Sequence, residues 1–302
     1  MAGHSEELPV VLVTGLAGFT GQHLARALEA AGWRVIGLDR QASATGAVET
    51  RACNLLDRNE VIREIGAIAP SAVIHLAGIS SVMHENVGEI YETNIMGTRN
   101  LLEALAKNNT KIRSIVLASS ATIYGNMGGR PIDEMTVPAP ANDYAVSKLA
   151  MEFLAKTYLD KLPITLIRPF NYTGRGQSEG FVIPKIVKHF KQHAPFIELG
   201  NIDVVREFSD VRRVATAYAR LLSFSGKGEI YNICSGVGMS LREIISVAEG
   251  LTGYHPEIRK NAAFVRNNEV EVLIGSCAKI ETALGTLPNY SITETLSWML
   301  EG

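Results

Sequence analysis

Three side chains in the middle of the chain could together hold a carbonyl oxygen and give it a proton. Ser120 belongs to the run SSATIYG, and Tyr144 and Lys148 follow beyond a loop with several prolines. A phenol has a pKa near ~10 in a model peptide, so it exchanges protons poorly at neutral pH unless its ionised form is stabilised. A nearby lysine ammonium provides that stabilisation, and a serine hydroxyl can hold the oxygen that receives the proton. Alone, the spacing YxxxK also fits an ordinary amphipathic helix.

A predicted strand and a predicted helix would position these groups. Residues 114–118 (SIVLA) are apolar and partly β-branched, which is typical of a buried parallel strand, so Ser119 and Ser120 should lie at its carboxyl end. Ligands bind at that end in open α/β sheets. Asn142 and Asp143 precede a segment rich in helix formers, for which we predict a helix over residues 144–158. Tyr144 and Lys148 then share a helix face.

A glycine-rich turn near the start of the chain indicates a phosphate site. Residues 9–14 (PVVLVT) predict a strand, and Gly15, Gly18 and Gly21 follow it before a helical pattern that runs through Ala30. Glycines permit a tight turn and the close approach of a pyrophosphate to the backbone, while the helix start supplies free N–H groups. The spacing is GxxGxxG rather than the commoner GxGxxG.

An acidic residue then ends the next predicted strand. That strand covers Trp33 to Leu38, and Asp39 follows it, where a carboxylate can accept hydrogen bonds from the hydroxyls of an adenosine ribose. Arg40 comes next and could instead attract a 2′-phosphate. The glycine turn and the strand-terminal acid together predict a bound dinucleotide.

Strands and helices alternate through the first 170 residues, which predicts an α/β fold with a doubly wound parallel sheet. A third strand is expected around Val73 to Leu76, and we interpret His75 as a buried, hydrogen-bonded histidine rather than a metal ligand. A helix is expected over residues 91–105, with Ile95, Leu101, Leu102 and Leu105 facing inward. Asn94 on that helix could be a structural hydrogen-bonder or a ligand contact. Residues 166–171 predict a further strand.

Composition limits the class of protein. The 302 residues are 46% hydrophobic and 20% charged, with a formal charge of −2 and a pI of about 6.4, so no basic patch suggests binding to nucleic acid. No apolar run reaches ~18 residues and no signal-peptide pattern is present, so we expect no membrane span and a cytoplasmic protein. Cys53, Cys234 and Cys277 are widely spaced, which argues against a disulfide framework or a zinc site and favours free thiols.

The chain resembles the extended short-chain dehydrogenase/reductase family, also called NAD-dependent epimerase/dehydratases. The resemblance rests on GxxGxxG, HLAG at residues 75–78, Asn94, SSATIYG and YxxxK. It implies a Rossmann domain over residues 1–170, with a return segment near 205–225, and a smaller α/β substrate domain over residues 171–302. It also implies NAD(H) as the preferred cofactor with NADP(H) as the alternative, a nucleotide-diphosphate sugar as substrate, and a homodimer formed through a four-helix bundle.

The resemblance further implies a set of site residues, with Ser120, Tyr144 and Lys148 as the catalytic group. The cofactor would be bound by Gly15, Gly18, Phe19, Thr20, Gly21, Asp39, Arg40, Asn54, Leu55, Leu76, Ala77, Gly78, Asn94, Tyr144 and Lys148. The substrate would be bound by Ser80, Ser120, Asn171, Arg206 and Arg266. Asn171 would meet the diphosphate and the two arginines would grip its phosphates, because a guanidinium binds phosphate bidentately. Each arginine, taken alone, also fits a solvated surface charge.

The later segments narrow the reaction class. RPFNYTGRGQSEGF at residues 168–181 and GEIYNICSG at residues 228–236 resemble the branch that reduces GDP-linked 4-keto-6-deoxyhexoses. Thr122 stands where the dehydratase branch has a glutamate for water elimination, so dehydratase activity is disfavoured. We therefore expect a reductase with Tyr144 as proton donor. A nucleotide-sugar 4-epimerase and a non-catalytic nucleotide-binding scaffold are the alternatives.

Overall fold

A computed structural model describes residues 8–42, 48–80, 84–108, 111–224, 226–264 and 270–302. The chain divides into two compact units, and each contains several separate stretches of sequence. The first unit comprises residues 1–119, 142–167 and 215–230. The second comprises residues 120–141, 168–214 and 231–302. No helix in the described stretches is both long and apolar enough to cross a bilayer.

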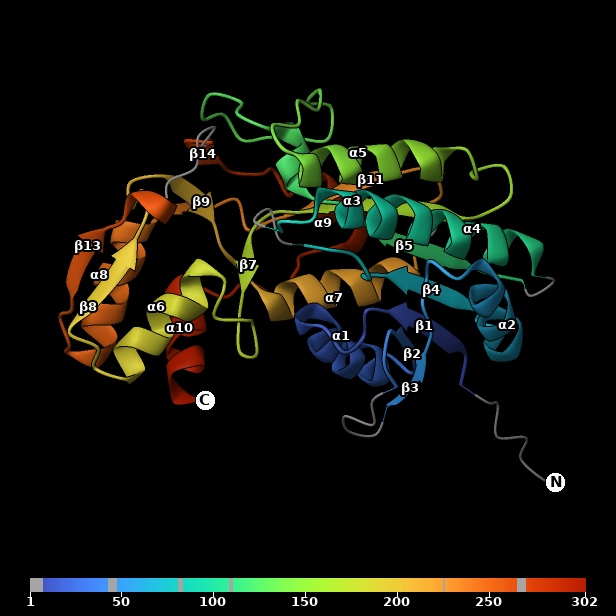
Figure 1. Ribbon diagram of the computed structural model, residues 1–302, viewed down its shortest axis with the longest axis horizontal. Coiled ribbons are helices and arrows are strands. Elements are labelled where there is room, and N and C mark those ends of the chain that lie inside the picture. The colour runs from blue at the N-terminus through green and yellow to red at the C-terminus, as the bar shows by residue number, and fades with distance from the viewer. Residues whose placement is uncertain (1–7, 43–47, 81–83, 109–110, 225, 265–269) are drawn as a thin grey trace. The chain divides into compact units, whose positions relative to one another are not determined.

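Most strands of the central sheet belong to the first unit (Figure 1). Within the described residues the sheet has seven strands in the order β11-β6-β5-β4-β1-β2-β3, and each pairing from β6 to β3 is parallel. Its central strands are apolar on both faces because helices cover both sides of such a sheet. The strands are β1 (Val10–Thr14), β2 (Arg34–Asp39), β3 (Glu49–Ala52), β4 (Ala72–His75), β5 (Ser114–Ala118), β6 (Ile164–Pro169) and β11 (Ile230–Ile233).

The strand order determines where a ligand can bind. The chain runs outward from β1 through β2 to β3, and then crosses to the other side of β1 to form β4. Adjacent connections therefore leave the sheet in opposite directions at the carboxyl ends of β1 and β4. Open parallel sheets bind nucleotides at such a switch point. This mostly parallel α/β arrangement is the Rossmann-like fold that the sequence predicts.

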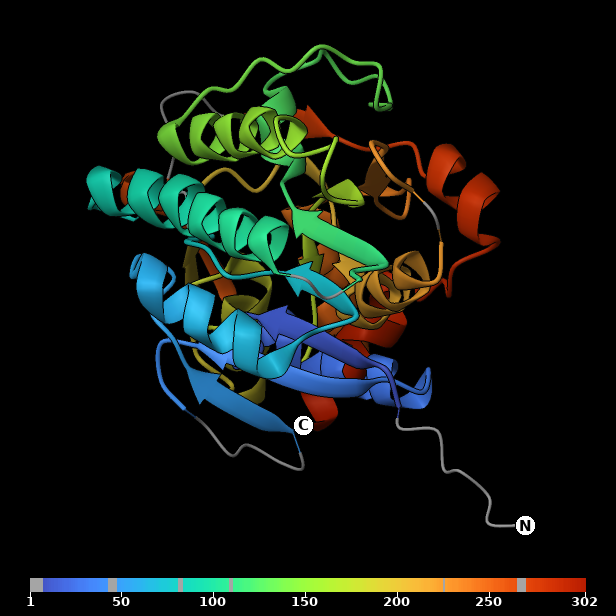
Figure 2. The same ribbon diagram turned by 90° about the vertical axis from the view of Figure 1, so that its right-hand side faces the viewer.

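Helices pack on both faces of this sheet (Figure 2). α2, α4 and α5 cover one face, where Leu101 and Leu102 of α4 and Met151 of α5 are buried against Leu12 and Ile115 of the strands. α1 lies on the opposite face. The helical elements are α1 (Phe19–Ala30), α2 (Arg58–Ile68), α3 (Val87–Tyr91), the π-helical turn η1 (Glu92–Gly97), α4 (Thr98–Lys107), α5 (Asp143–Lys156) and α7 (Val211–Leu222).

Several predicted boundaries were wrong. The strand at residues 72–75 is the fourth and not the third, because the short polar segment Glu49–Ala52 forms an edge strand. The helix expected over residues 91–105 starts at Val87 and contains the π-helical turn, and Ile95 is only half-buried. The strand expected over residues 166–171 is Ile164–Pro169. By contrast, β5 has the predicted bounds.

The second unit has its own apolar core. Ile186 and Phe190 of α6, Ile197 of β8, Ile244 of α8 and Leu296 of α10 are among its buried residues. Capping boxes at Ser240 and Ser291 start α8 and α10. Its elements are η2 (Ala121–Tyr124), β7 (Tyr172–Thr173), α6 (Val182–Lys191), β8 (Phe196–Leu199), β9 (Val205–Glu207), β10 (Ser209–Asp210), β12 (Gly238–Ser240), α8 (Leu241–Thr252), β13 (Glu257–Lys260), η3 (Ala262–Phe264), β14 (Val272–Leu273), α9 (Ala278–Leu284) and α10 (Ile292–Glu301).

Candidate active site

The glycine turn after β1 is packed too closely to accept a side chain. Gly15 has a φ of +74°, and a Cβ there would lie 2.8 Å from the backbone nitrogen of Ala77. A Cβ at Gly21 would overlap the carbonyl of Leu16. α1 is N-capped by Gly18, and no side chain of a described residue caps it. The turn thus presents an uncapped helix start at the switch point, which suits an anionic pyrophosphate.

Asp39 is fixed beside this turn. One of its carboxylate oxygens accepts a hydrogen bond from the N–H of Ala17 at 2.8 Å. The carboxylate therefore lies at the end of β2, next to the glycine turn, where a ribose hydroxyl could reach it. Arg40 follows with an 85% exposed side chain, 3.9 Å from Glu89. A carboxylate and a guanidinium therefore follow each other in the sequence at the end of β2, near the turn where a cofactor would bind.

His75 at the end of β4 is buried and hydrogen-bonded, as predicted. Its Nδ1 lies 2.6 Å from Thr14 Oγ1, and its Nε2 lies 2.9 Å from Thr98 Oγ1. Burial and, to a lesser degree, the charge of Lys148 lower the pKa of His75 to about 3. The imidazole is therefore neutral at physiological pH, and its role is to join β4 to β1 and α4.

Asn94 lies in the π-helical turn and connects three segments. Its Oδ1 accepts from the N–H of Ile79 at 2.9 Å, and its Nδ2 donates to the carbonyl of Ile79 at 3.2 Å and to Ser147 Oγ at 3.0 Å. The sequence left two roles open for Asn94, a structural hydrogen-bonder or a ligand contact. These hydrogen bonds show the structural role, and the ligand contact stays a prediction. Asn94 holds the backbone that follows Gly78 against α5. π-Helical turns of this kind occur often at functional sites.

Tyr144 and Lys148 occupy the first turns of α5, which Asn142 caps by accepting from the N–H of Ala145 at 2.9 Å. Both side chains are buried. Lys148 Nζ donates to the carbonyl of Ala118 at 2.9 Å, at the last residue of β5. Burial lowers the pKa of Lys148 to about 8, although the carboxylate of Glu152 acts in the opposite direction. The lysine is thus a buried cation at neutral pH that is unusually easy to deprotonate.

Ser119 follows the carbonyl that Lys148 contacts, and its hydroxyl is the one buried side-chain oxygen or nitrogen for which the described residues supply no hydrogen-bond partner. A buried hydroxyl without a partner costs free energy, which a bound ligand can recover. Ser119 was not among the predicted site residues. Its position directly before Ser120, at the carboxyl end of a parallel strand, was the available signal.

Ser120 begins the second unit and N-caps the 3-10 turn η2. Its Oγ accepts from the N–H of Thr122 at 3.2 Å and from Thr122 Oγ1 at 2.9 Å. The two adjacent serines therefore differ. Ser119 is buried without a described partner, whereas the acceptor sites of Ser120 are occupied by one neighbour.

A buried polar network supports the turn that Ser120 caps. Tyr124 donates to Asn232 Oδ1 at 2.8 Å and accepts from Arg168 Nη1 at 2.9 Å. Burial raises the pKa of Tyr124 to about 12, against the opposing charge of Arg168. Asn232 is held in turn, because its backbone N–H donates to Glu134 at 2.7 Å and its side chain donates to the carbonyl of Ile132 at 3.0 Å. Tyr124 is therefore a neutral structural phenol, unlike the role predicted for Tyr144.

Several other predicted site residues have contacts or an exposure that the structure describes. Asn54 Oδ1 accepts from the N–H of Leu56 at 3.0 Å, and Leu55 packs against the core of the first unit. Ser80 and Asn171 are exposed. Arg206 donates from Nη1 to the carbonyls of Val205 at 2.9 Å and Glu271 at 3.1 Å, and from Nη2 to the carbonyl of Val270. Arg266 lies outside the described residues.

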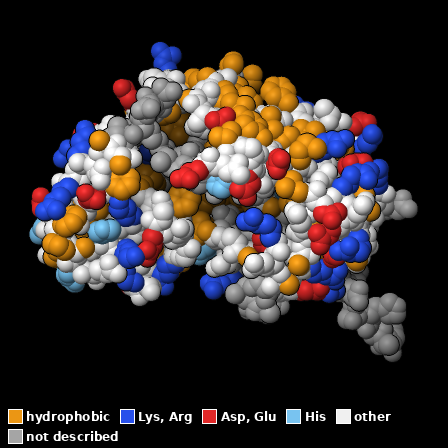
Figure 3. Space-filling model, viewed as in Figure 1, with side chains coloured by type: hydrophobic (Ala, Val, Ile, Leu, Met, Phe, Trp, Pro, Cys, Tyr) orange, Lys and Arg blue, Asp and Glu red, His pale blue; other side chains and the backbone are white. Residues whose placement is uncertain are grey.

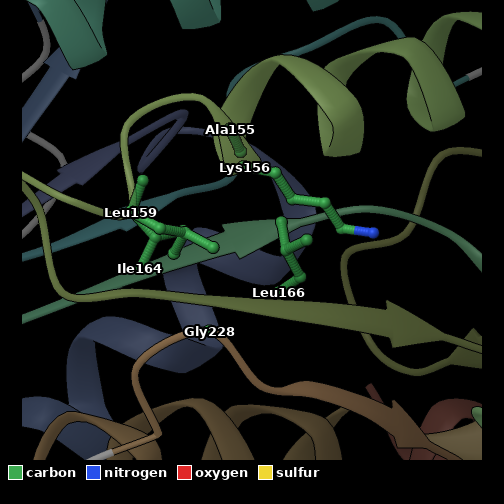
Figure 4. A pocket seen from close by; sticks show the side chains of 6 residues that line it. All are labelled: Ala155, Lys156, Leu159, Ile164, Leu166 and Gly228. Carbon is green, nitrogen blue, oxygen red and sulfur yellow. The ribbon is translucent and has the colours of Figure 1, made fainter.

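A small hollow in the first unit is not part of this site (Figure 4). Its lining is mostly aliphatic, and Lys156 directs its amine away from the other labelled side chains. It lies near the carboxyl end of α5, about 16 Å along the helix from Tyr144 at 1.5 Å per residue. We interpret it as a packing gap. It is lined by Ala155, Lys156, Leu159, Ile164, Leu166 and Gly228.

Comparison with known proteins identifies relatives over nearly the whole chain. Residues 11–234 match the NAD dependent epimerase/dehydratase family. The GDP-6-deoxy-D-talose 4-dehydrogenase of Aggregatibacter actinomycetemcomitans is 32% identical over 91% of both chains. The GDP-6-deoxy-D-mannose reductase of Pseudomonas aeruginosa is 33% identical over 96% of this chain and 95% of the relative. A UDP-glucose 4-epimerase of Halalkalibacterium halodurans is 30% identical over 95% of this chain and 92% of the relative.

Solved structures show the same fold. A crystal structure from Burkholderia cenocepacia J2315 is 43% identical over 97% of both chains, with a TM-score of 0.90. The structure of RMD from Pseudomonas aeruginosa, complexed with NADPH, is 33% identical over 97% of this chain and 98% of that chain, with a TM-score of 0.85.

Proposed function

We propose that this chain, which belongs to the NAD dependent epimerase/dehydratase family, is a reductase. It would reduce the C4 ketone of GDP-4-keto-6-deoxy-D-mannose and so form GDP-D-rhamnose. Oxidoreductases of the short-chain dehydrogenase/reductase type act on nucleotide sugars in this family, and the two relatives named for GDP-6-deoxyhexoses favour this substrate. The observation that carries the proposal is the pair on α5. Tyr144 is buried at its start, and the Lys148 ammonium is held against the end of β5, directly before Ser119 and Ser120.

Two features of the first unit suit a dinucleotide cofactor. The glycine turn has no room for side chains, and the buried hydroxyl of Ser119 has no partner among the described residues. When bound, NAD(P)H supplies the hydride for C4. The uncapped start of α1 would hold the pyrophosphate and Asp39 would hold the adenosine ribose. We propose NAD(H) as the preferred form, because the Asp39 carboxylate repels a 2′-phosphate, with NADP(H) as the alternative that Arg40 and the NADPH-bound relative support.

Three side chains would carry the proton chemistry. Tyr144 gives its phenolic proton to the C4 oxygen as that oxygen becomes an alkoxide, and Ser120 donates a hydrogen bond to the same oxygen. Lys148 favours the phenolate that remains, because an opposite charge stabilises the ionised form. The pKa of Lys148 near 8 means that this charge is present at neutral pH. His75 takes no part, since it is neutral and both ring nitrogens have partners.

The second unit would bind the sugar nucleotide. We assign Asn171 to the diphosphate, Arg206 and Arg266 to phosphate contacts, and Ser80 to a further substrate contact. The guanidinium of Arg206 donates hydrogen bonds to the carbonyls of Val205, Glu271 and Val270. These contacts orient the planar guanidinium, which is the group that binds phosphate bidentately.

An exposed apolar face supports a homodimer. Val87 of α3, Met96 of η1, and Val146 and Phe153 of α5 have exposures of 42%, 43%, 40% and 60%. Hydrophobic side chains gather over α5 in the space-filling view (Figure 3). A cluster of this kind on a soluble protein indicates an interaction surface. We propose that a second copy covers this α3–α5 face, so that the helices of two subunits form a four-helix bundle.

Product analysis separates this activity from its alternatives. The enzyme would be incubated with GDP-, UDP- and dTDP-linked sugars. The 4-keto-6-deoxyhexoses would be supplied with NADH or NADPH, and the corresponding 4-hydroxyhexoses with NAD⁺. Loss of the reduced nicotinamide absorbance with formation of GDP-D-rhamnose supports the reductase. Interconversion of the two C4 isomers of a 4-hydroxy sugar, without net change in absorbance, would support the 4-epimerase, which the UDP-glucose 4-epimerase relative makes the second candidate. Cofactor binding without turnover on the panel would instead support a scaffold.

A further inference from the structure

The hydroxyl of Ser120 has both of its acceptor sites occupied by a single neighbour. The backbone N–H of Thr122 lies 3.2 Å from Ser120 Oγ, and the Thr122 hydroxyl lies 2.9 Å from the same atom. A serine hydroxyl offers one O–H donor and accepts at two lone pairs. Because Thr122 uses both lone pairs, the capacity left to Ser120 is the donation of its own proton.

The turn that carries Thr122 is held in place by buried groups. Ile123 and Tyr124 follow it in η2 and are fully buried. The Tyr124 hydroxyl is fixed between Arg168 and Asn232 at 2.9 Å and 2.8 Å. The carbonyl of Thr122 also accepts from the N–H of Gly125 at 3.2 Å. Thr122 is therefore a fixed donor, while its half-buried side chain stays outside the core.

We propose that Thr122 is a positioning residue, which commits the Ser120 hydroxyl to donate toward the C4 oxygen of the substrate. The inference rests on the proposed function, because it names how one member of the catalytic group is prepared. Reduction turns a carbonyl oxygen into an alkoxide, and an oriented donor stabilises the developing charge. A hydroxyl free to rotate would spend part of its time as an acceptor, which gives no stabilisation. Thr122 removes that state before the substrate binds.

Substitution of the threonine hydroxyl tests the inference. Thr122→Val keeps the β-branched shape and the backbone N–H but removes the side-chain donor, whereas Thr122→Ser keeps a hydroxyl. A neutral hydrogen bond of this kind corresponds to a roughly 3- to 10-fold change in rate. We expect Thr122→Val to lower kcat by that factor with GDP-4-keto-6-deoxy-D-mannose, at unchanged KM. Thr122→Ser should stay near wild type.

A double-mutant cycle shows whether Thr122 acts through Ser120. If it does, Thr122→Val should cause no further loss in a Ser120→Ala background, because its target is absent. Thr136→Val is the matched control, since the Thr136 hydroxyl donates to Asp133 at 3.1 Å in the same unit. That variant should retain wild-type kcat. Thermal melting verifies folding, and Thr122→Ala replaces Thr122→Val if the valine variant melts early.

Two results would overturn the inference. One is a wild-type kcat for Thr122→Val. The other is the same fold loss with and without the Ser120 hydroxyl, which would mean that Thr122 acts independently. Failure of the proposed function looks different, because the wild-type enzyme itself would then not turn over GDP-4-keto-6-deoxy-D-mannose.

Discussion

Raising the pH from 7 to 9 should lower kcat/KM for the keto sugar about 10-fold, because Lys148 loses its charge in this interval. Burial lowers the pKa of Lys148 to about 8. The lysine is then about 90% charged at pH 7 and about 10% charged at pH 9. The cation is the active form, since it stabilises the Tyr144 phenolate, so activity is present below the pKa and lost above it. This ratio applies to kcat/KM, which reports the free enzyme.

The assay is the initial rate of NADH or NADPH oxidation with GDP-4-keto-6-deoxy-D-mannose between pH 6 and 10. Lys148→Met should be slow at every pH and should lack the descending limb. Cys277→Ser is the control, because a hydrogen bond from Cys234 lowers the pKa of the Cys277 thiol to about 7 and it titrates in the same range. That variant should keep the limb. A flat wild-type profile, or an unchanged limb in Lys148→Met, would refute the role given to Lys148.

Four further substitutions test other parts of the site. Asp39→Ala should weaken NADH binding more than NADPH binding in fluorescence titrations, and equal weakening would contradict the ribose role. Arg206→Ala should raise KM for the sugar nucleotide about 10-fold, the order expected for a charge-assisted hydrogen bond, without changing cofactor affinity. Tyr144→Phe should lower kcat by about 10²–10⁴ while both ligands still bind in calorimetry. Phe153→Glu should give monomers in light scattering, whereas Val237→Glu, at an equally exposed apolar position, should not.

Local patterns predicted the elements that carry the chemistry. β5 and the start of α5 were predicted because an apolar β-branched run and a capping asparagine act over a few residues. β3 was missed because Glu49–Ala52 is a polar edge strand, and pairing with β2 rather than its own pattern makes it extended. The π-helical turn was missed because its residues lie within a continuous helical pattern in the sequence.

Contacts between distant parts of the sequence could not be predicted from local patterns. The carbonyls that bind Arg206 include those of Val270 and Glu271, more than sixty residues away. The partners of Asn94, at Ile79 and Ser147, likewise depend on the fold. The contact between Thr122 and Ser120 is local, and the spacing Ser-x-Thr could have suggested it. The prediction for Thr122 concerned only its lack of a carboxylate.

The most direct test of the central claim follows the hydride. The enzyme would be supplied with GDP-4-keto-6-deoxy-D-mannose and a reduced nicotinamide cofactor that carries deuterium at its transferable position, and the product would be examined by NMR and mass spectrometry. We expect one deuterium per product molecule, located at C4 of GDP-D-rhamnose, with equal consumption of cofactor. Recovery of unchanged keto sugar without loss of cofactor, or deuterium at a position other than C4, would contradict the reductase assignment.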